Sequence, residues 1–404
     1  MLSVIRHWTI WLVLLAIAVA VQAAELQHEI RVPGIPDVRQ EIRFPDLPGY
    51  RTLVCDLHTH TVFSDGSVWP PVRIREAWRQ GLHVLAITDH IEYRPHKEDL
   101  PRGYDRSPVL AAGEAATRDI LLIRGAEITR DTPPGHFNAL FVKDLPALEH
   151  EDLLEVFRRA NAQDAFAFWN HPGWQGAERG KWLELHTTVY ENKWLHGIEI
   201  CNNECYYQQA HQWAIDKNLT LIGTSDVHEP ELRRKNTADD HRTVTLVLAK
   251  EKTADALKEA LRAGRTIVWW RGRLIGREQW LRPFFDACVE VQPPHHRIKN
   301  AVFVHVRNRC EADIRLENTG KVGPKEILLP AGTVSLLRIA AADPNKPTKL
   351  QYTATNFLIA PPRRDCRPRS TSPACSSNPK RPVAATKWRG RWPQPNMEGR
   401  ALSR

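Results

Sequence analysis

Short apolar runs alternate with amphipathic stretches from Leu53 to about Val268, and this alternation constrains the fold more than any other feature of the chain. An amphipathic stretch between two apolar runs is typical of a helix that crosses from one parallel strand to the next. The runs are Leu53–Cys55, Val84–Thr88, Ile120–Arg124, Ala139–Val142, Ala165–Trp169, Gly197–Ile200, Leu219–Gly223 and Val244–Leu248. Helical patterns separate several of them, at Pro71–Gln80, Ser107–Arg118, Glu149–Ala162, Glu204–Asp216 and Ala254–Ala263. This pattern predicts an α/β protein built on a β/α barrel.

Residues that bind metals gather at the ends of these runs, where the working residues of a β/α barrel lie. The first run leads into His58 and His60, and residues two apart on a strand point to the same face. A lone His-x-His also arises by coincidence, but histidines and carboxylates recur at other run ends. Together they are ligands for borderline divalent metals such as Zn, Mn or Fe. The candidate metal ligands are His58, His60, Asp65, His90, Glu127, His136, His171, Asp226 and His228.

Nine candidate ligands are too many for one ion, because a single metal takes three or four protein ligands. They suit two or three ions, with a carboxylate such as Glu127 shared between neighbours. Divalent ions roughly 3.5–4 Å apart are the standard device for phosphoester hydrolysis. The predicted catalytic residues are His58, His60, Asp65, His90, Glu127, Asp226 and His228.

Other residues beside the candidate ligands are expected to support them. Asp56 and Asp89 adjoin ligand positions, and we expect them to orient histidines rather than to bind a metal. Three basic residues would hold the phosphate or its substituent, although each also fits a solvated loop: Arg94, His96 and Arg130. Four aromatic residues would either wall a substrate pocket or pack into the core: Tyr93, Trp174, Tyr206 and Tyr207.

The chain divides into five segments. Residues 1–24 have a charged start, an apolar core of 14 residues and small residues at a cleavage position, which is typical of a secretory signal peptide. An uncleaved N-terminal anchor is the alternative. The remaining predicted segments are a Pro-rich extended arm at 25–52, the barrel at 53–290, a small antiparallel β-module at 295–360 and a disordered basic tail at 361–404.

The net charge of +9 does not predict nucleic-acid binding, because all of the excess lies in the predicted tail. Residues 361–404 contain 11 Lys/Arg and 2 Asp/Glu, whereas a nucleic-acid footprint should lie on the folded domain. We therefore expect an exported protein, periplasmic or secreted, whose partner is a small-molecule phosphoester. We expect no contact with a membrane after signal cleavage, and the sequence does not predict an oligomeric state.

The order of the motifs resembles that of the PHP (polymerase and histidinol phosphatase) superfamily over about residues 53–268. The motifs are His-x-His, Asp, Thr-Asp-His, Gly-x-Glu, His, Asn-His-Pro and Ser-Asp-x-His. The resemblance implies a distorted barrel, usually of seven strands, with up to three ions of Mn, Zn or Fe and a hydroxide bridging the first two. The implied ligand sets are His58, His60, Glu127 and Asp226 for the first ion, Asp65, His90 and His228 for the second, and Glu127, His136 and His171 for the third.

The flanking segments resemble those of a narrower group, the exported Sb-PDE family of phosphodiesterases. The likeness includes the signal peptide, the Pro-rich arm, the segments Ile87–His96 and Leu274–Glu278, and the β-module. Members act on small organophosphate diesters, so the resemblance implies an exported phosphodiesterase.

Several other functions fit parts of the pattern. A phosphomonoesterase of the histidinol-phosphatase kind is at odds with export, because biosynthetic intermediates are not found outside the cytoplasm. A nuclease is disfavoured by the neutral barrel, and a metal-binding module without catalysis by the complete ligand set. A serine hydrolase built on Ser225, Asp226 and His228 would leave seven site residues unexplained, and the chain lacks a Gly-x-Ser-x-Gly elbow.

Overall fold

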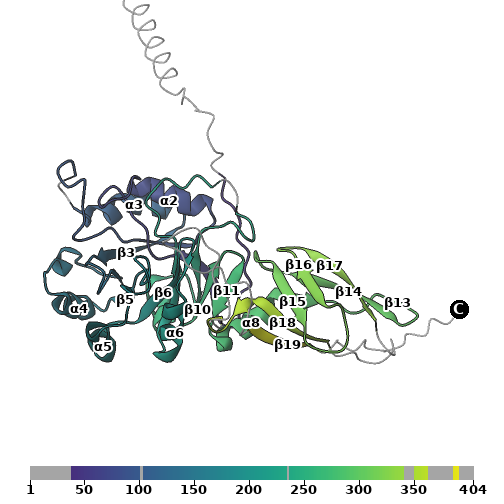
Figure 1. Ribbon diagram of the computed structural model, residues 1–404. Helices are drawn as coiled ribbons and strands as arrows, with labels where there is room; N and C mark the ends of the chain where they lie inside the picture. Colours follow the sequence, from purple (N-terminus) through teal and green to yellow (C-terminus); the bar gives the residue numbers. More distant parts are fainter. Residues whose placement is uncertain (1–37, 101–102, 234–235, 341–349, 363–384, 391–404) are drawn as a thin grey trace, which may run out of the picture. The chain divides into compact units, whose positions relative to one another are not determined.

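The computed structural model describes residues 38–100, 103–233, 236–340 and 350–362 and the backbone of 385–390 (Figure 1). The predicted signal peptide and most of the predicted tail lie outside these residues. The helices are α2 (Pro70–Arg79), α3 (Arg106–Thr117), the 3-10 helix η1 (Pro146–Leu148), α4 (Leu153–Ala162), α5 (Glu184–Glu191), α6 (Gln208–Asp216), α7 (Ala254–Arg262) and α8 (Glu278–Cys288). The strands up to α8 are β1 (Arg51–Asp56), β2 (Val84–Ile87), β3 (Leu121–Ile128), β4 (Phe137–Leu140), β5 (Phe166–Trp169), β6 (Gly197–Asn202), β7 (Cys205–Tyr206), β8 (Thr220–Thr224), β9 (Val244–Ala249), β10 (Thr266–Trp270) and β11 (Arg273–Gly276). Those after α8 are β12 (Val289–Val291), β13 (His296–Ile298), β14 (Ala301–Asn308), β15 (Ile314–Asn318), β16 (Glu326–Leu329), β17 (Val334–Ala340), β18 (Leu350–Leu358) and β19 (Ala385–Gly390).

The barrel strands belong to one mixed sheet, in which β9, β1, β2, β3, β4, β5 and β6 are successive neighbours and β8 pairs with β6. Strands β1, β2 and β3 are parallel to one another, as are β5, β6 and β8. Helices α2 and α3 pack on each other beside β2 and β3, α6 packs on β6, and α7 packs on β9. This arrangement confirms the predicted α/β class and the distorted barrel.

The expectation of parallel units throughout is wrong at β4 and β9. Strand β4 is antiparallel to both β3 and β5, and β9 is antiparallel to β1. Only residues 129–136 separate β3 from β4, and a parallel crossover needs a dozen residues or more. The chain therefore turns back directly, so that β4 begins at the edge of the sheet where β3 ends.

Among the described strands, β8 forms a backbone ladder only with β6. Side chains therefore close the barrel between β8 and the β9–β10 pair. The Thr245 hydroxyl accepts a hydrogen bond from the Gly223 amide at 3.0 Å and donates one to the Gly223 carbonyl at 2.8 Å. Gly223 also lies close to β10, because a Cβ atom built on it would be 2.2 Å from Cγ1 of Val268. The close approach of β8 and β10 therefore requires a residue without a side chain.

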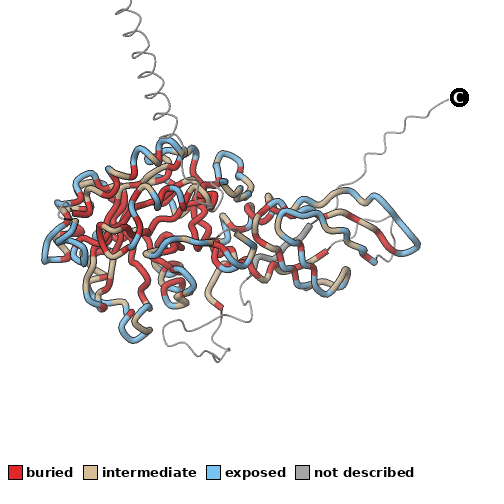
Figure 2. The backbone as a smooth tube through the Cα atoms, turned by 90° about the horizontal axis from the view of Figure 1, so that it is seen from above, coloured by how far each residue is buried: buried red, intermediate tan, exposed pale blue. Residues whose placement is uncertain are grey.

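The interior of the barrel is filled by apolar side chains from its strands. One buried cluster contains residues from β1, β2, β3, β4, β5, β8 and β9 together with α7. Figure 2 shows buried residues, in red, gathered in the interior of the part of the molecule that contains the barrel. Because apolar residues fill the lumen, polar side chains that face inward gather above it, at the carboxyl ends of the strands.

The β-module follows α8 without a break, and the prediction of a small antiparallel module is confirmed. Strand β14 pairs with β12, β13 and β17, each in the antiparallel sense. Strands β15, β16 and β18 join the large sheet, where β18 lies parallel to β11. Strand β19 falls within the stretch predicted as a disordered tail, and its backbone pairs with β18.

The described part of the predicted arm, up to β1, contains no helix and lies against the barrel. Arg39 donates hydrogen bonds to three carbonyls at the end of α2, those of Trp78, Gly81 and Leu82. The ring of Phe44 lies 5.0 Å from that of Trp269 on β10. Within the described ranges, no helix combines the length and the apolar character needed to cross a membrane.

Replacement of Gly223 by alanine tests the closure of the barrel. We expect Gly223→Ala to destabilise the protein by about 1–3 kcal/mol, because the new methyl group overlaps Val268. Gly113→Ala is the matched control, since Gly113 is an exposed position in α3 with nothing within 4 Å of an added Cβ. It should stabilise the protein by roughly 0.5–1 kcal/mol. Urea denaturation measures both, and equal effects would contradict the proposed role of Gly223.

Candidate metal centre

Backbone hydrogen bonds hold the segments that follow the barrel strands against one another. The Asp226 amide donates to the His58 carbonyl at 3.0 Å, and the Glu127 amide donates to the Asp89 carbonyl at 3.2 Å. Single bridges between Thr59 and Val227 and between His90 and Glu127 extend the parallel pairing beyond the regular strands. The backbone therefore fixes the candidate ligands relative to one another before their side chains interact.

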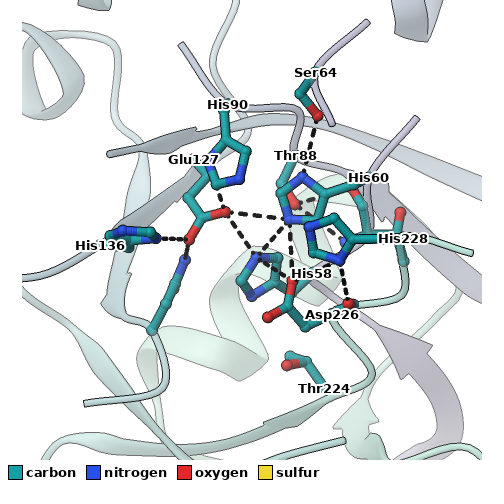
Figure 3. A network of polar contacts seen from close by, with 12 residues as sticks. His58, His60, Ser64, Thr88, His90, Glu127, His136, Thr224, Asp226 and His228 are labelled. Carbon is teal, nitrogen blue, oxygen red and sulfur yellow. Dashed lines mark hydrogen bonds and ion pairs between the residues drawn. The ribbon is translucent and has the colours of Figure 1, made fainter. Parts of the chain in front are cut away.

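A first group of ligands contains His58, His60, Glu127 and Asp226, whose ligand atoms all lie within 4.8 Å of one another. The Nε2 atoms of the two histidines are 3.0 Å apart, and each lies 3.1 Å from Oε2 of Glu127. Oδ1 of Asp226 is 3.2 Å from the first histidine and 3.1 Å from the second. Figure 3 shows these side chains converging from different segments of the chain.

Two further groups adjoin the first and share residues with it. The second contains His60, Asp65, His90 and His228, with Oδ1 of Asp65 3.2 Å from Nε2 of His228. The third contains His90, Glu127 and His136, with Oε1 of Glu127 3.0 Å from Nδ1 of His136.

His171 lies beside the same cluster. Its Nε2 atom is 3.3 Å from Oε1 of Glu127 and 3.8 Å from Oδ2 of Asp226. The structure thus brings all nine candidate residues together, from segments that are up to 170 residues apart in the chain.

The hydrogen bonds of the histidines turn their lone pairs toward the centre. Nδ1 of His58 lies 2.9 Å from Oε1 of Glu199, and because a carboxylate only accepts, this nitrogen carries the proton. Nδ1 of His228 likewise donates to the carbonyl of Asp226 at 2.8 Å. In the neutral form of both rings, the Nε2 atoms therefore present lone pairs, as metal-binding histidines do.

The carboxylates also suit bound cations. Oδ1 of Asp65 and Oδ1 of Asp226 are buried and have no hydrogen-bond partner among the described residues. Burial by itself would raise the pKa of Glu127, but the neighbouring imidazoles of His90 and His58 hold it well below its usual value. An ionised, buried carboxylate, with oxygens beside it that accept no hydrogen bond from the described residues, favours a positive ion, so the donor set fits divalent metals.

Asp89 and Asp56 both contact the ligand segments, but of the two only Asp89 acts on the ring of a histidine. Ser64 donates to Oδ1 of Asp89 at 2.9 Å, and its oxygen accepts from Nδ1 of His60 at 3.2 Å. Asp56 accepts from the hydroxyl of Ser225 at 2.5 Å and forms an ion pair with Arg242 at 3.0 Å. Neither carboxylate belongs to a group of converging ligand atoms.

Glu199 and Arg73 are supporting residues that the sequence analysis missed. Besides His58, the fully buried Glu199 accepts from the amide of His171 at 2.7 Å and from the hydroxyl of Thr224 at 2.6 Å. The sequence signal that could have identified Glu199 is its charge inside the otherwise apolar run Gly197–Ile200. Arg73, also fully buried, donates to the carbonyls of His60 at 3.1 Å and His228 at 2.8 Å.

The predicted substrate-binding residues lie on the loops beside the ligands. Arg130 forms an ion pair with Glu92 and donates to the carbonyl of His150 at 2.6 Å. The guanidinium of Arg94 lies 5.2 Å from the ring centre of Tyr104, and His96 is exposed. A role for Arg94, His96 and Arg130 in substrate binding stays a prediction.

Comparison with known proteins identifies the family. A solved structure from Bacteroides vulgatus, of a two-domain protein containing a predicted PHP-like metal-dependent phosphoesterase, is 43% identical with a TM-score of 0.76. The match covers 80% of this chain and 96% of that one. This chain belongs to the PHP-like metal-dependent phosphoesterases. It is therefore a metal-dependent hydrolase of phosphoesters, as the order of the motifs predicts.

Two further matches cover single parts of this phosphoesterase. An uncharacterised protein of Methanocaldococcus jannaschii is 36% identical over 190 residues, which are 44% of this chain and 82% of that protein. A family described as an Ig-like domain matches residues 289–364, a range that begins with the first residue of β12.

Loss of the Glu199 carboxylate tests its support of His58. We expect Glu199→Gln to weaken binding of Zn²⁺ or Mn²⁺ about 10–100-fold, because the ring of His58 loses its charged acceptor. Competition with a chelator gives the affinity, and circular dichroism verifies the fold. Glu191→Gln, at an exposed position in α5, should bind metal like the wild type. Unchanged affinity in Glu199→Gln would contradict the assigned role.

Metal binding should also depend on pH. Burial alone would lower the pKa of His58, but Asp226, Glu127 and Glu199 raise it well above its ordinary value. Asp65 and Asp226 likewise outweigh burial and raise the pKa of His228. A metal must displace these protons, so affinity should rise with pH across neutrality. Proton release on addition of Zn²⁺ to weakly buffered protein measures this, and the absence of release would contradict it.

Proposed function

We propose that this phosphoesterase is an exported phosphodiesterase that hydrolyses small organophosphate diesters. The observation that carries the proposal is that the three groups of ligands share residues. The first and second groups share His60, the first and third share Glu127, and the second and third share His90. Positions joined in this way suit two or three divalent ions close enough together to contact one phosphate group.

The protein residues would position the substrate and limit the access of water. Bound Mn, Zn or Fe ions would supply charge stabilisation and acidify a water molecule. The side chains of His58, His60 and Glu127 are at most 1% exposed, whereas those of Asp226, Asp65 and His228 are 17%, 21% and 32% exposed. We infer that the substrate approaches from the side of Asp65 and His228, while the deeper residues hold the site rigid.

The engagement of Arg130 within the protein supports a diester rather than a monoester. A phosphomonoester carries up to two negative charges near neutral pH and a diester carries one, so a monoester benefits more from additional cations. Arg130 follows the Glu127 segment, but its guanidinium is already engaged by Glu92 and by the carbonyl of His150. Because this guanidinium already pairs with a protein carboxylate, less positive charge is left for the substrate. This favours the diester, which carries the smaller negative charge.

The proposal of export rests on the sequence. Residues 1–24 have the pattern of a signal peptide, and the flanking segments resemble those of the exported Sb-PDE phosphodiesterases. A periplasmic or secreted enzyme would meet small organophosphate diesters outside the cytoplasm.

A paired rate assay tests the proposed reaction. Metal-loaded protein should hydrolyse bis(p-nitrophenyl) phosphate faster than p-nitrophenyl phosphate. His58→Ala should reduce the diester rate at least about 100-fold, because the loss of one ligand disrupts the shared site. His296→Ala, at an exposed position in the β-module, is the matched control and should keep full activity. A preference for the monoester would indicate a phosphatase, and turnover that survives His58→Ala would disprove the assigned centre.

A further inference from the structure

Two exposed aromatic side chains adjoin the metal centre. Tyr93 is 53% exposed and Trp174 is 42% exposed, although both are large side chains that gain free energy from burial. The ring of Tyr93 lies 5.8 Å from that of His90, in an edge-to-face arrangement. The ring of Trp174 lies 6.0 Å from that of His136 and 5.8 Å from that of His171. Both aromatic residues therefore contact candidate metal ligands and retain a surface that faces solvent.

A row of ring-to-ring contacts links the two side chains. The rings of His90 and His136 are 5.7 Å apart, so the row runs from Tyr93 through these histidines to Trp174. The row includes two members of the third group of ligands, His90 and His136, and both lie beside Glu127 (Figure 3). A phosphate held at this group would place its substituents near the aromatic rings that contact His90 and His136.

The other two aromatic candidates do not have this position. Tyr206 is 6% exposed and belongs to the buried core of the barrel. Tyr207 packs against the same core, and a Cβ atom on Gly173 would be 2.9 Å from its ring. Tyr207 thus lies against the residue before Trp174 and Tyr206 lies in the core, whereas Tyr93 and Trp174 are exposed.

The loop of Trp174 is held in place by the protein itself. The Trp174 amide donates to the carbonyl of His171 at 3.0 Å, so the tryptophan is tied to a candidate ligand. Arg179, further along the loop, donates to the carbonyl of Thr132 at 2.9 Å. A ring presented on a fixed loop loses little conformational entropy when it binds another ring.

We propose that Trp174 and Tyr93 form a stacking subsite for a planar aromatic group, such as an aryl ring or a nucleobase, on the phosphoester. The inference rests on the proposed function and adds the substrate class. Stacking suits any planar ring, because every aromatic group has a π-face. Stacking on an aromatic ring also contributes more binding free energy than contact with a saturated ring of similar size. Trp174 contacts two ligand histidines and is the principal residue of this subsite, and Tyr93 contacts a third ligand histidine.

Binding of phosphonates tests the subsite without turnover, because their carbon–phosphorus bond resists hydrolysis. Calorimetry on the metal-loaded full chain would compare phenylphosphonate, cyclohexylphosphonate and methylphosphonate. We expect phenylphosphonate to bind about tenfold more tightly than cyclohexylphosphonate. Trp174→Ala should abolish this preference, Trp174→Phe should retain most of it, and Tyr93→Ala should reduce it. All variants should bind methylphosphonate like the wild type.

Trp69→Ala is the matched control, since Trp69 is 50% exposed and packs edge-on against Phe63. It should leave all three affinities unchanged. Equal binding of the phenyl and cyclohexyl compounds by the wild type would overturn the subsite, as would an equal loss of all three in Trp174→Ala. If the phenyl preference holds but no phosphodiester is hydrolysed, the proposed function fails while the subsite stands. If diesters are hydrolysed without any phenyl preference, only the subsite fails.

Discussion

The buried carboxylate of Glu127 is the interaction on which the metal centre depends. Its two oxygens lie within 3.3 Å of nitrogen atoms of five histidines: His58, His60, His90, His136 and His171. An isolated buried carboxylate would be strongly unfavourable, and here imidazoles surround it and Asn170 donates a hydrogen bond to it at 2.8 Å. Because Glu127 belongs to two of the three groups of candidate ligands, its position links these groups, and the surrounding strands must hold it rigidly.

Polar residues below the ligands provide that rigidity. Glu199 fixes the ring of His58 and the backbone of His171, and Arg73 binds the carbonyls of two ligand segments. Asp89 acts on His60 through the hydroxyl of Ser64. These contacts bury charge, which is tolerable only when every charge finds a partner. The result is a centre whose ligands are oriented before a metal binds, with two exposed aromatic side chains beside it.

Much of the barrel could be predicted from the chain because its strands are short apolar runs that end in polar residues. Helix α5 was missed, since Thr187, Thr188 and Val189 are poor helix formers. Its stability comes from tertiary contacts instead. The ring of His186 stacks on that of Trp169 at 4.0 Å and hydrogen-bonds to the carbonyl of Pro134. Such contacts join distant segments and leave no local pattern, which is also why β4 was not recognised as antiparallel.

The sequence by itself determined the chemistry of this protein. The types and order of nine residues indicate a phosphoesterase metal centre, because few other functions need so many histidines and carboxylates at strand ends. Only the tertiary structure decided which side chains share a ligand group, that Glu199 holds His58, and which tyrosines are core and which aromatic rings face solvent. Distances and burial depend on how strands from separate parts of the chain pack together. The spacing of residues along the chain does not contain that information.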